Sequence, residues 1–397
     1  MRKVSIVCLI AAVVGSACSS TGPGTSPSAP SPVTSTGPVT SPTGAPPVTG
    51  GSITFVDTAG GANFQKFFGQ ILPGASTELG IDIKYVPGSG AELQTRLEAQ
   101  KGAEADVDLA LIKPDVLGNM LKAGLAFEPL TDHATQIPNL AFIEPNDLKE
   151  AFGLETNGQA TPFFRDQFGI LFDSAKIPNP PKSWQEFFDR RAEWAGHIGM
   201  IRPDAKSGGG RLMLRDFLIG AGVDFSKSLA ELQASAEWKD GLEKFREFAT
   251  AMYQPLASEA TVLFQQFKNG DVWISEYAID FTLWSRDQGL LPETMKAAVF
   301  DSGMYGGAAY LAVPANAPAD KKERAYRVLD WLLSEKTQVQ MQTEMWEYMA
   351  INKFDAVPAK TWDTIPRWDD IKAKRLPLTN LDAFNWLKEN GMSYAGG

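Results

Sequence analysis

The segment between Ile53 and Ile112 alternates short apolar strands with helical stretches, and this alternation restricts the fold more than any other feature. Strands are expected at 53–56, 81–86 and 107–112, with apolar residues at helical spacing between them. Strands that alternate with helices predict a mostly parallel sheet covered by helices on both faces, which is an α/β fold. Ligands of such sheets bind beyond the carboxyl ends of the strands. The loops after the first and third strands therefore supply the first candidate ligand-binding residues, which are Thr58, Gly60, Gly61, Lys113 and Asp115.

The start of the chain predicts export and anchoring. Arg2 and Lys3 precede an apolar stretch at 4–14, which is shorter than the ~20 residues that span a bilayer and is typical of a cleaved signal peptide. The small residues before Cys18 resemble the lipobox of bacterial lipoproteins, in which the cysteine is lipidated; the alternative is an ordinary signal peptide with an incidental cysteine. Residues 19–50 contain only Ser, Thr, Pro, Gly, Ala and Val, which predicts a semi-stiff spacer.

These features assign 1–17 to a lipoprotein signal peptide and 18–51 to a linker that follows a lipidated Cys18. The folded body is then expected at the outer face of the cytoplasmic membrane, extracellular or periplasmic, and attached by lipid. The formal net charge of −10 becomes more negative once Arg2 and Lys3 are removed. An acidic protein disfavours nucleic acid and anionic membrane surfaces as partners and favours a cationic ligand.

The residue types that carry most enzyme chemistry are scarce in the body. Both cysteines, Cys8 and Cys18, precede it, which excludes disulfides and thiolate metal sites there. His133 and His197 are far apart, and the sequence has no GxSxG, HExxH or P-loop motif. We therefore expect a binding protein with neither cofactor nor metal, and we keep a lipid-anchored surface enzyme with a carboxylate pair as a distant alternative.

Four stretches in order resemble the extracellular solute-binding proteins of bacterial ABC importers. The first is GIDIKYVPGSGAELQTRLEAQKGAEADVDLALI, which is similar to the first lobe of that family. The next two resemble its crossing strands, and the fourth its closing strand and helix: TPFFRDQFGILFDSAKIPNPPKSWQEFF, LFQQFKNGDVWISEYAIDF and GGAAYLAVPANAPADKKERAYRVLDWLLSEKTQVQMQ. Within the family, the chain looks closest to the branch of polyamine, thiamine, phosphonate and iron binders.

The resemblance implies a two-lobed periplasmic-binding-protein-like fold of type II, with a ligand cleft between the lobes. The first lobe would comprise 52–162 plus 276–314, and the second 166–275 plus 318–397. The chain would cross out near 163–169, back near 273–278 and out again near Pro314. The family closes around its ligand by hinge motion. The implied function is the capture of a small polar solute by a monomeric protein, followed by delivery to the permease of an ABC transporter.

The crossing strands and one glycine-rich loop supply the remaining candidates. Arg165 and Asp166 form either a private salt bridge or ligand contacts, since buried charges need partners. The carboxylates of Glu276 and Asp280, with Tyr277 between them, suit an ammonium group or form a solvated hinge edge.

The segment from Ser207 through Gly208 to Arg211 is either a plain turn or an anion site at a helix N-terminus. Tyr305 and the segment 346–348 could supply pocket walls. The acidic balance and the Glu276-Tyr277…Asp280 cluster favour a polyamine-like cation. The mixture of acids and bases among the candidates leaves an organic or phosphorylated anion, or a sugar, as the alternative.

Overall fold

The computed structural model describes residues 50–396. The predicted signal peptide, the predicted lipidation site at Cys18 and nearly all of the predicted linker lie outside the described residues. Among the residues that are described, no helix is both long enough and apolar enough to cross a membrane.

A six-stranded sheet forms the first lobe, in the order β12-β6-β11-β3-β1-β2. Strand β1 pairs in parallel with β2 and β3, as the alternation of strands and helices predicts. Strand β11 runs antiparallel to β3 and β6, and β12 antiparallel to β6. The strands are β1 (Ser52–Asp57), β2 (Asp82–Pro87), β3 (Leu109–Ile112), β6 (Thr161–Arg165), β11 (Ala309–Ala312) and β12 (Tyr348–Met349).

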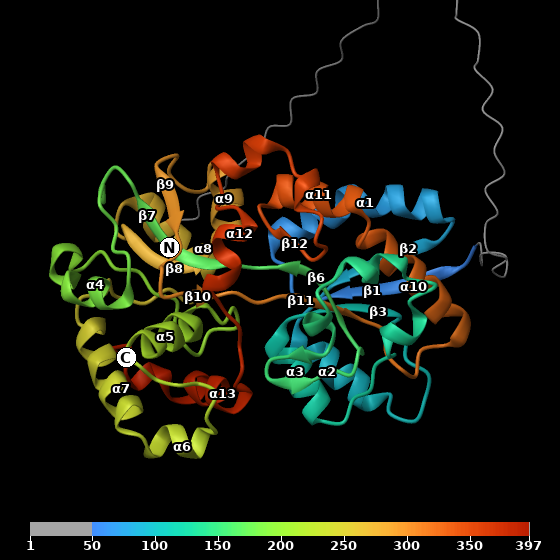
Figure 1. Cartoon of the computed structure of the whole chain (residues 1–397), viewed down its shortest axis with the longest axis horizontal. Helices are drawn as coiled ribbons and strands as arrows, with labels where there is room; N and C mark the ends of the chain where they lie inside the picture. The colour runs from blue at the N-terminus through green and yellow to red at the C-terminus, as the bar shows by residue number, and fades with distance from the viewer. Residues whose placement is uncertain (1–49, 397) are drawn as a thin grey trace, which may run out of the picture. The chain divides into compact units, whose positions relative to one another are not determined.

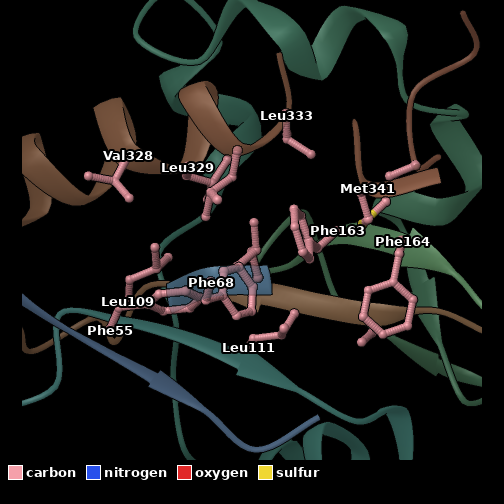
Figure 2. Close-up of a cluster of buried hydrophobic side chains, with 14 of the residues drawn as sticks. Phe55, Phe68, Leu109, Leu111, Phe163, Phe164, Val328, Leu329, Leu333 and Met341 are labelled. Atoms are coloured by element: carbon pink, nitrogen blue, oxygen red, sulfur yellow. The ribbon is translucent and has the colours of Figure 1, made fainter. Parts of the chain in front are cut away.

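Helices cover both faces of this sheet and bury its apolar side chains. In one of the two cores, Phe68 from α1 packs against Phe55 and Phe163 of the sheet, while Leu329 comes from α10 (Figure 2). Burying side chains of this size stabilises the fold by about 1.5–3 kcal/mol each. The helices of this lobe are α1 (Ala62–Leu79), α2 (Gly90–Ala99), α3 (Pro114–Lys122), α10 (Ala319–Leu332) and α11 (Glu335–Met345).

The second lobe is built around a three-stranded antiparallel sheet in the order β8-β7-β9. Its strands are β7 (Phe168–Asp173), β8 (Ile274–Ala278) and β9 (Met295–Ala298). Its core is rich in aromatic side chains such as Trp184, Phe217 and Phe248. The helices are α4 (Trp184–Asp189), α5 (Gly209–Gly220), α6 (Leu229–Ala234), α7 (Ala236–Ala249), α8 (Ala260–Asn269), α9 (Ile279–Asp287) and α13 (Leu381–Asn390).

Helix termini follow the residues that the sequence offers for them. The hydroxyl of Ser183 accepts a hydrogen bond from the backbone N–H of Glu186 and so begins α4. Helix α8 ends at Asn269, and Gly270 follows with a φ of 80°, the left-handed conformation that glycine adopts without steric cost. This helix end and the strand β8 after it form as predicted, but the chain does not cross to the first lobe here, because β8 pairs with β7 of the second lobe.

The lobe boundaries differ from the predicted ones in two places. Strands β8 and β9 pair with β7, so the chain stays in the second lobe through Ala298, and within 276–314 strand β11 belongs to the first sheet. Helices α10 and α11 pack on α1, as Figure 1 shows, and β12 joins the first sheet. Of the segment 318–397, α13 packs in the second lobe against α5. Amphipathic helices suit either sheet, which explains why their sequence did not reveal the lobe.

Three segments, two short and one long, therefore connect the lobes. The first is Asp166–Gln167 between β6 and β7, and the second is 306–308 before β11. The third follows β12, includes α12 (Trp368–Ile371) and ends at β13 (Arg375–Leu376), which pairs with β10 (Met304–Tyr305). The guanidinium of Arg375 donates to the carbonyl oxygens of Asp166 (2.9 Å) and Gly307 (2.6 Å). Arg375 thus joins all three crossings.

Candidate functional site

A cavity of about 310 Å³ is lined by segments of both lobes. Helix N-termini and crossing segments dominate its wall, as expected for a site beyond the carboxyl ends of strands. Most of the candidates lie in this wall: Gly60, Gly61, Lys113, Asp115, Asp166, Ser207, Gly208, Arg211, Tyr277, Asp280 and Tyr305. The structure thus brings together residues that are up to 245 positions apart in the chain, between Gly60 and Tyr305.

Thr58, Arg165 and Glu276 do not line this cavity. The buried hydroxyl of Thr58 donates to the carbonyl oxygen of Leu111 at 3.0 Å and so ties two strand ends together. Arg165 points to the other side of β6, where it forms an ion pair with Asp147 at 3.0 Å and donates to the carbonyl oxygen of Met349. Its salt bridge is therefore formed with a partner other than the predicted Asp166.

Glu276 is buried in the second lobe beside Asp216 and Arg215. Burial, and next the charge of Asp216, raise the pKa of Glu276 well above its ordinary value. Asp216 in turn forms a 2.6 Å ion pair with Arg215. Asp216 accepts a further hydrogen bond from the backbone N–H of Tyr305. Glu276 thus belongs to a buried network behind the cavity wall.

Three carboxyl groups gather at one end of the cavity, and we call Asp166, Asp280 and Glu347 the acid cluster. Asp166 lies at the first crossing, Asp280 in the first turn of α9, and Glu347 just before β12. Asp280 and Glu347 are 6% and 2% exposed. None of the ion pairs formed within residues 50–396 includes any of the three. One oxygen each of Asp280 and Glu347, Oδ1 and Oε2, has no hydrogen-bond partner.

Burial raises the pKa of every carboxyl group in the acid cluster. Burial, and next the charge of Asp280, raise the pKa of Glu347 well above its ordinary range. The pKa of Asp166 is raised to about 6, mainly by burial, although the positive charge of Arg375 lowers it. At neutral pH the cluster therefore holds negative charge in a desolvated place, and the charge of Arg375 offsets it only in part, so a cation that pairs with the cluster is favoured.

Aromatic rings share the cavity wall with the acid cluster. Phe64 stacks on Phe164 with ring centroids 4.7 Å apart, and Phe281 packs between Phe264 and Trp284. The aromatic side chains in the cavity wall are Phe64, Phe164, Phe168, Tyr277, Phe281, Tyr305 and Phe384. Carboxylates combined with ring faces are the surroundings that stabilise a desolvated ammonium group.

Two glycines allow the chain to pass close to these rings. A side chain at Gly307 would place its Cβ 1.9 Å from the Tyr305 hydroxyl, and one at Gly209 would lie 2.6 Å from the Tyr277 ring. Gly209, the first residue of α5, therefore has a packing role.

The N-terminus of α5 forms another part of the wall. Its first residues are Gly209 and Gly210, and no side chain caps it. Arg211 is 3% exposed, and its Nε has no hydrogen-bond partner, nor has the Ser207 hydroxyl. The Arg211 guanidinium lies over the Phe384 ring at 4.7 Å, and its nearest acid is Asp115 at 3.9 Å.

Lys113 and Asp115 approach the cavity from the first lobe. They belong to the N-terminal turn of α3, where Pro114 opens the helix. Within residues 50–396, Lys113 forms no ion pair, so its ammonium group faces the cavity without a fixed partner. Lys206 and Glu259, both exposed, complete the charged part of the wall.

Glu347 is the acid that the sequence did not single out. It follows α11, whose last turn ends at Trp346 in the left-handed conformation with a φ of 63°. The Trp346 indole donates to Asp287 at 2.8 Å, which holds this turn against the end of α9. The sequence indicated 346–348 only as a wall of the pocket, because nothing in it shows that this turn meets Asp280.

A family profile decides what class of protein this is. The profile described as "Bacterial extracellular solute-binding protein" matches residues 73–386. The chain belongs to that family. A solute-binding protein captures its ligand without converting it, which agrees with the lack of enzyme motifs. Among curated proteins, none matches the sequence.

Solved structures show that this solute-binding protein has the fold of its family. A spermidine/putrescine ABC transporter substrate-binding protein from Streptococcus pneumoniae has a TM-score of 0.67 and 15% identity, over 87% of this chain and 99% of the other. A maltose-bound protein of T. maritima has a TM-score of 0.69 and 14% identity, over 87% of this chain and 95% of the other. A Trichodesmium protein in complex with iron and citrate has a TM-score of 0.58 and 15% identity, over 86% of this chain and 98% of the other. The two-lobed α/β fold is thus confirmed, while the ligands of these proteins differ.

Proposed function

We propose that this protein is the substrate-binding component of an ABC-type importer, which captures a small solute with a cationic amine outside the membrane and delivers it to the permease. The observation that carries the proposal is the acid cluster, which faces the cavity and forms no ion pair within residues 50–396. An ammonium group there would replace its hydration by carboxylate hydrogen bonds and ring faces. Each such contact is worth on the order of 1–3 kcal/mol when desolvated.

The competing ligand classes receive less support as the sole ligand. A sugar would satisfy hydroxyl-bonding groups but would leave the charge of the acid cluster uncompensated. A simple anion would be repelled by the acid cluster, although α5 and Arg211 would attract it. The spermidine/putrescine protein from S. pneumoniae has the same fold, which agrees with an amine ligand.

The test begins with thermal shift over a panel of amines, amino acids, carboxylates and sugars, since a ligand stabilises the folded state by mass action. Calorimetry on variants follows. We expect Asp280→Asn and Glu347→Gln to weaken amine binding by about tenfold or more, because 1.4 kcal/mol corresponds to a factor of ten.

Glu276→Gln is the matched control, because it makes the same replacement as Glu347→Gln at an equally buried position that lies outside the cavity wall. Glutamine has nearly the same shape and can donate a hydrogen bond to Asp216, so amine binding should change by less than twofold. Equal affinity in wild type and in both cluster variants would refute the proposal.

We further propose that Cys18 carries a lipid that anchors the protein outside the cytoplasmic membrane. The support is the small-residue run before Cys18 and the uncharged spacer after it. An extracellular solute-binding protein has to stay near its permease, and an anchored spacer keeps its local concentration high.

A further inference from the structure

Beyond the amine, we propose that the same cavity binds an oxyanion at the N-terminus of α5, so that the ligand is a small zwitterion with an ammonium group and a carboxylate or phosphate-type group. This inference rests on the proposed amine function and adds a second recognition point to it. The sequence left a cationic and an anionic ligand as alternatives. The structure places the groups for both in one cavity wall.

Backbone donors supply the first part of the oxyanion site. Helix α5 has 12 residues, and no side chain accepts from its first N–H groups. Within residues 50–396, the backbone N–H groups of Gly209, Gly210 and Arg211 bond to no acceptor. Free N–H groups and the helix dipole together attract an anion.

Arg211 supplies the second and independent part. Its side chain folds back over the start of its own helix, since a Cβ at Gly208 would lie 3.2 Å from Arg211 Nη2. The side chain is 3% exposed, forms no hydrogen bond within residues 50–396, and has only a loose 3.9 Å approach to Asp115. Burial lowers the pKa of this guanidinium, as expected for a charge without an adequate partner.

The Ser207 hydroxyl is the third donor and is also unpartnered. An oxyanion that accepts from these donors and from Arg211 would give each of them a charge-assisted bond. Lys113 and Lys206 add positive charge to the same wall, and Asp115 opposes it. The oxyanion would thus replace Asp115 as the partner of Arg211.

Tyr277 separates the two ends of the site. Its ring lies against Gly209 at the start of α5, and the charges of Asp280 and Asp166 act on its hydroxyl. No ion pair of the described residues joins Arg211 to the acid cluster, so the opposite charges do not neutralise each other within the protein. A ligand that carries both charges satisfies both ends, whereas a diamine leaves Arg211 unpaired.

The test uses chemically matched probes of equal chain length in calorimetry: an α,ω-diamine, an ω-amino carboxylate, an aminoalkyl phosphate and a dicarboxylate. We expect one of the two zwitterions to bind at least tenfold more tightly than the diamine, and the better one identifies the oxyanion. Ser207→Ala and Arg211→Ala should weaken zwitterion binding, Arg211→Ala by tenfold or more, and neither should weaken diamine binding, because Arg211 repels a diamine. Circular dichroism and melting curves check folding, and Arg211→Lys offers a second variant that keeps the charge.

Two results would overturn the inference. If the diamine binds as tightly as either zwitterion and the Ser207 and Arg211 variants change nothing, the oxyanion site is refuted while the amine function stands. If the dicarboxylate binds and no amine-bearing probe does, or if no probe binds at 10 mM, both proposals fail.

Discussion

Replacing Asp166 by asparagine is expected to stabilise the ligand-free protein at neutral pH and to weaken its binding of an amine. The Oδ1 atom of Asp166 accepts from the backbone N–H of Gly307 at 2.9 Å, and asparagine can accept the same hydrogen bond. The substitution therefore removes a charge without removing that contact. A residue that serves the ligand is here expected to destabilise the empty protein.

The magnitude follows from the carboxyl group's pKa, which is about 6 in the folded protein against an ordinary value of 3.8. At about 1.4 kcal/mol for each pH unit, the full difference is about 3 kcal/mol, and partial exposure reduces it to ~1–3 kcal/mol. As the pH rises, the unfolded chain ionises first and the folded protein only near pH 6, so wild-type stability is lost between these values. The asparagine side chain of the variant does not titrate, so the variant's advantage develops between about pH 4 and pH 6, is complete above about pH 6 and vanishes below about pH 4.

Differential scanning calorimetry without ligand at pH 4 and pH 8 measures the effect. For about 350 folded residues the unfolding entropy is about 0.7 kcal/mol/K, so Tm should rise by about 1–4 °C at pH 8. Asp132→Asn is the control, because Asp132 is exposed and forms no ion pair within residues 50–396. A Tm for Asp166→Asn that rises equally at both pH values, or falls at pH 8, would contradict the reasoning.

Three further predictions concern binding, closure and anchoring. Amine affinity should fall about tenfold between pH 7.5 and pH 5, because Asp166 takes up a proton near pH 6; calorimetry at both pH values checks this, and a flat profile would contradict it. A cognate ligand should lower the radius of gyration with unchanged secondary structure, and superposable scattering curves would exclude hinge closure. Cys18→Ser should abolish labelling by a fatty-acid analogue and release the protein from the membrane, whereas persistent labelling would count against the anchor.

The sequence predicted the α/β lobes and the binding loops because both depend on local patterns. The loops after β1 and β3 meet at the cavity because the carboxyl ends of parallel strands share one edge. The alternation of side chains along a strand explains why some candidates do not line the cavity. Successive strand residues point to opposite faces, so Tyr277 faces the cavity and Glu276 faces away, and Asp166 likewise faces the cavity while Arg165 does not.

The remaining differences depend on contacts between distant segments. Glu347 reaches the acid cluster only because the turn at Trp346 is held against α9, which no local pattern reveals. The lobe that receives α10 depends on which apolar surface its buried face covers, and here that is α1 and β1 of the first lobe.

Arg375 limits the way in which the two lobes can move. It lies at the end of the third crossing, bonds to the backbone of the other two, and stacks on Trp368 at 4.8 Å, while Arg165 approaches the same indole at 4.9 Å. Crossings fastened at one point share a single pivot, so sliding or twisting one lobe past the other would break these bonds. Opening and closing are the motions that preserve them. Asp166 lies in the first crossing and its carbonyl oxygen is bonded to Arg375, so we expect its carboxyl group to stay nearly in place when the lobes close.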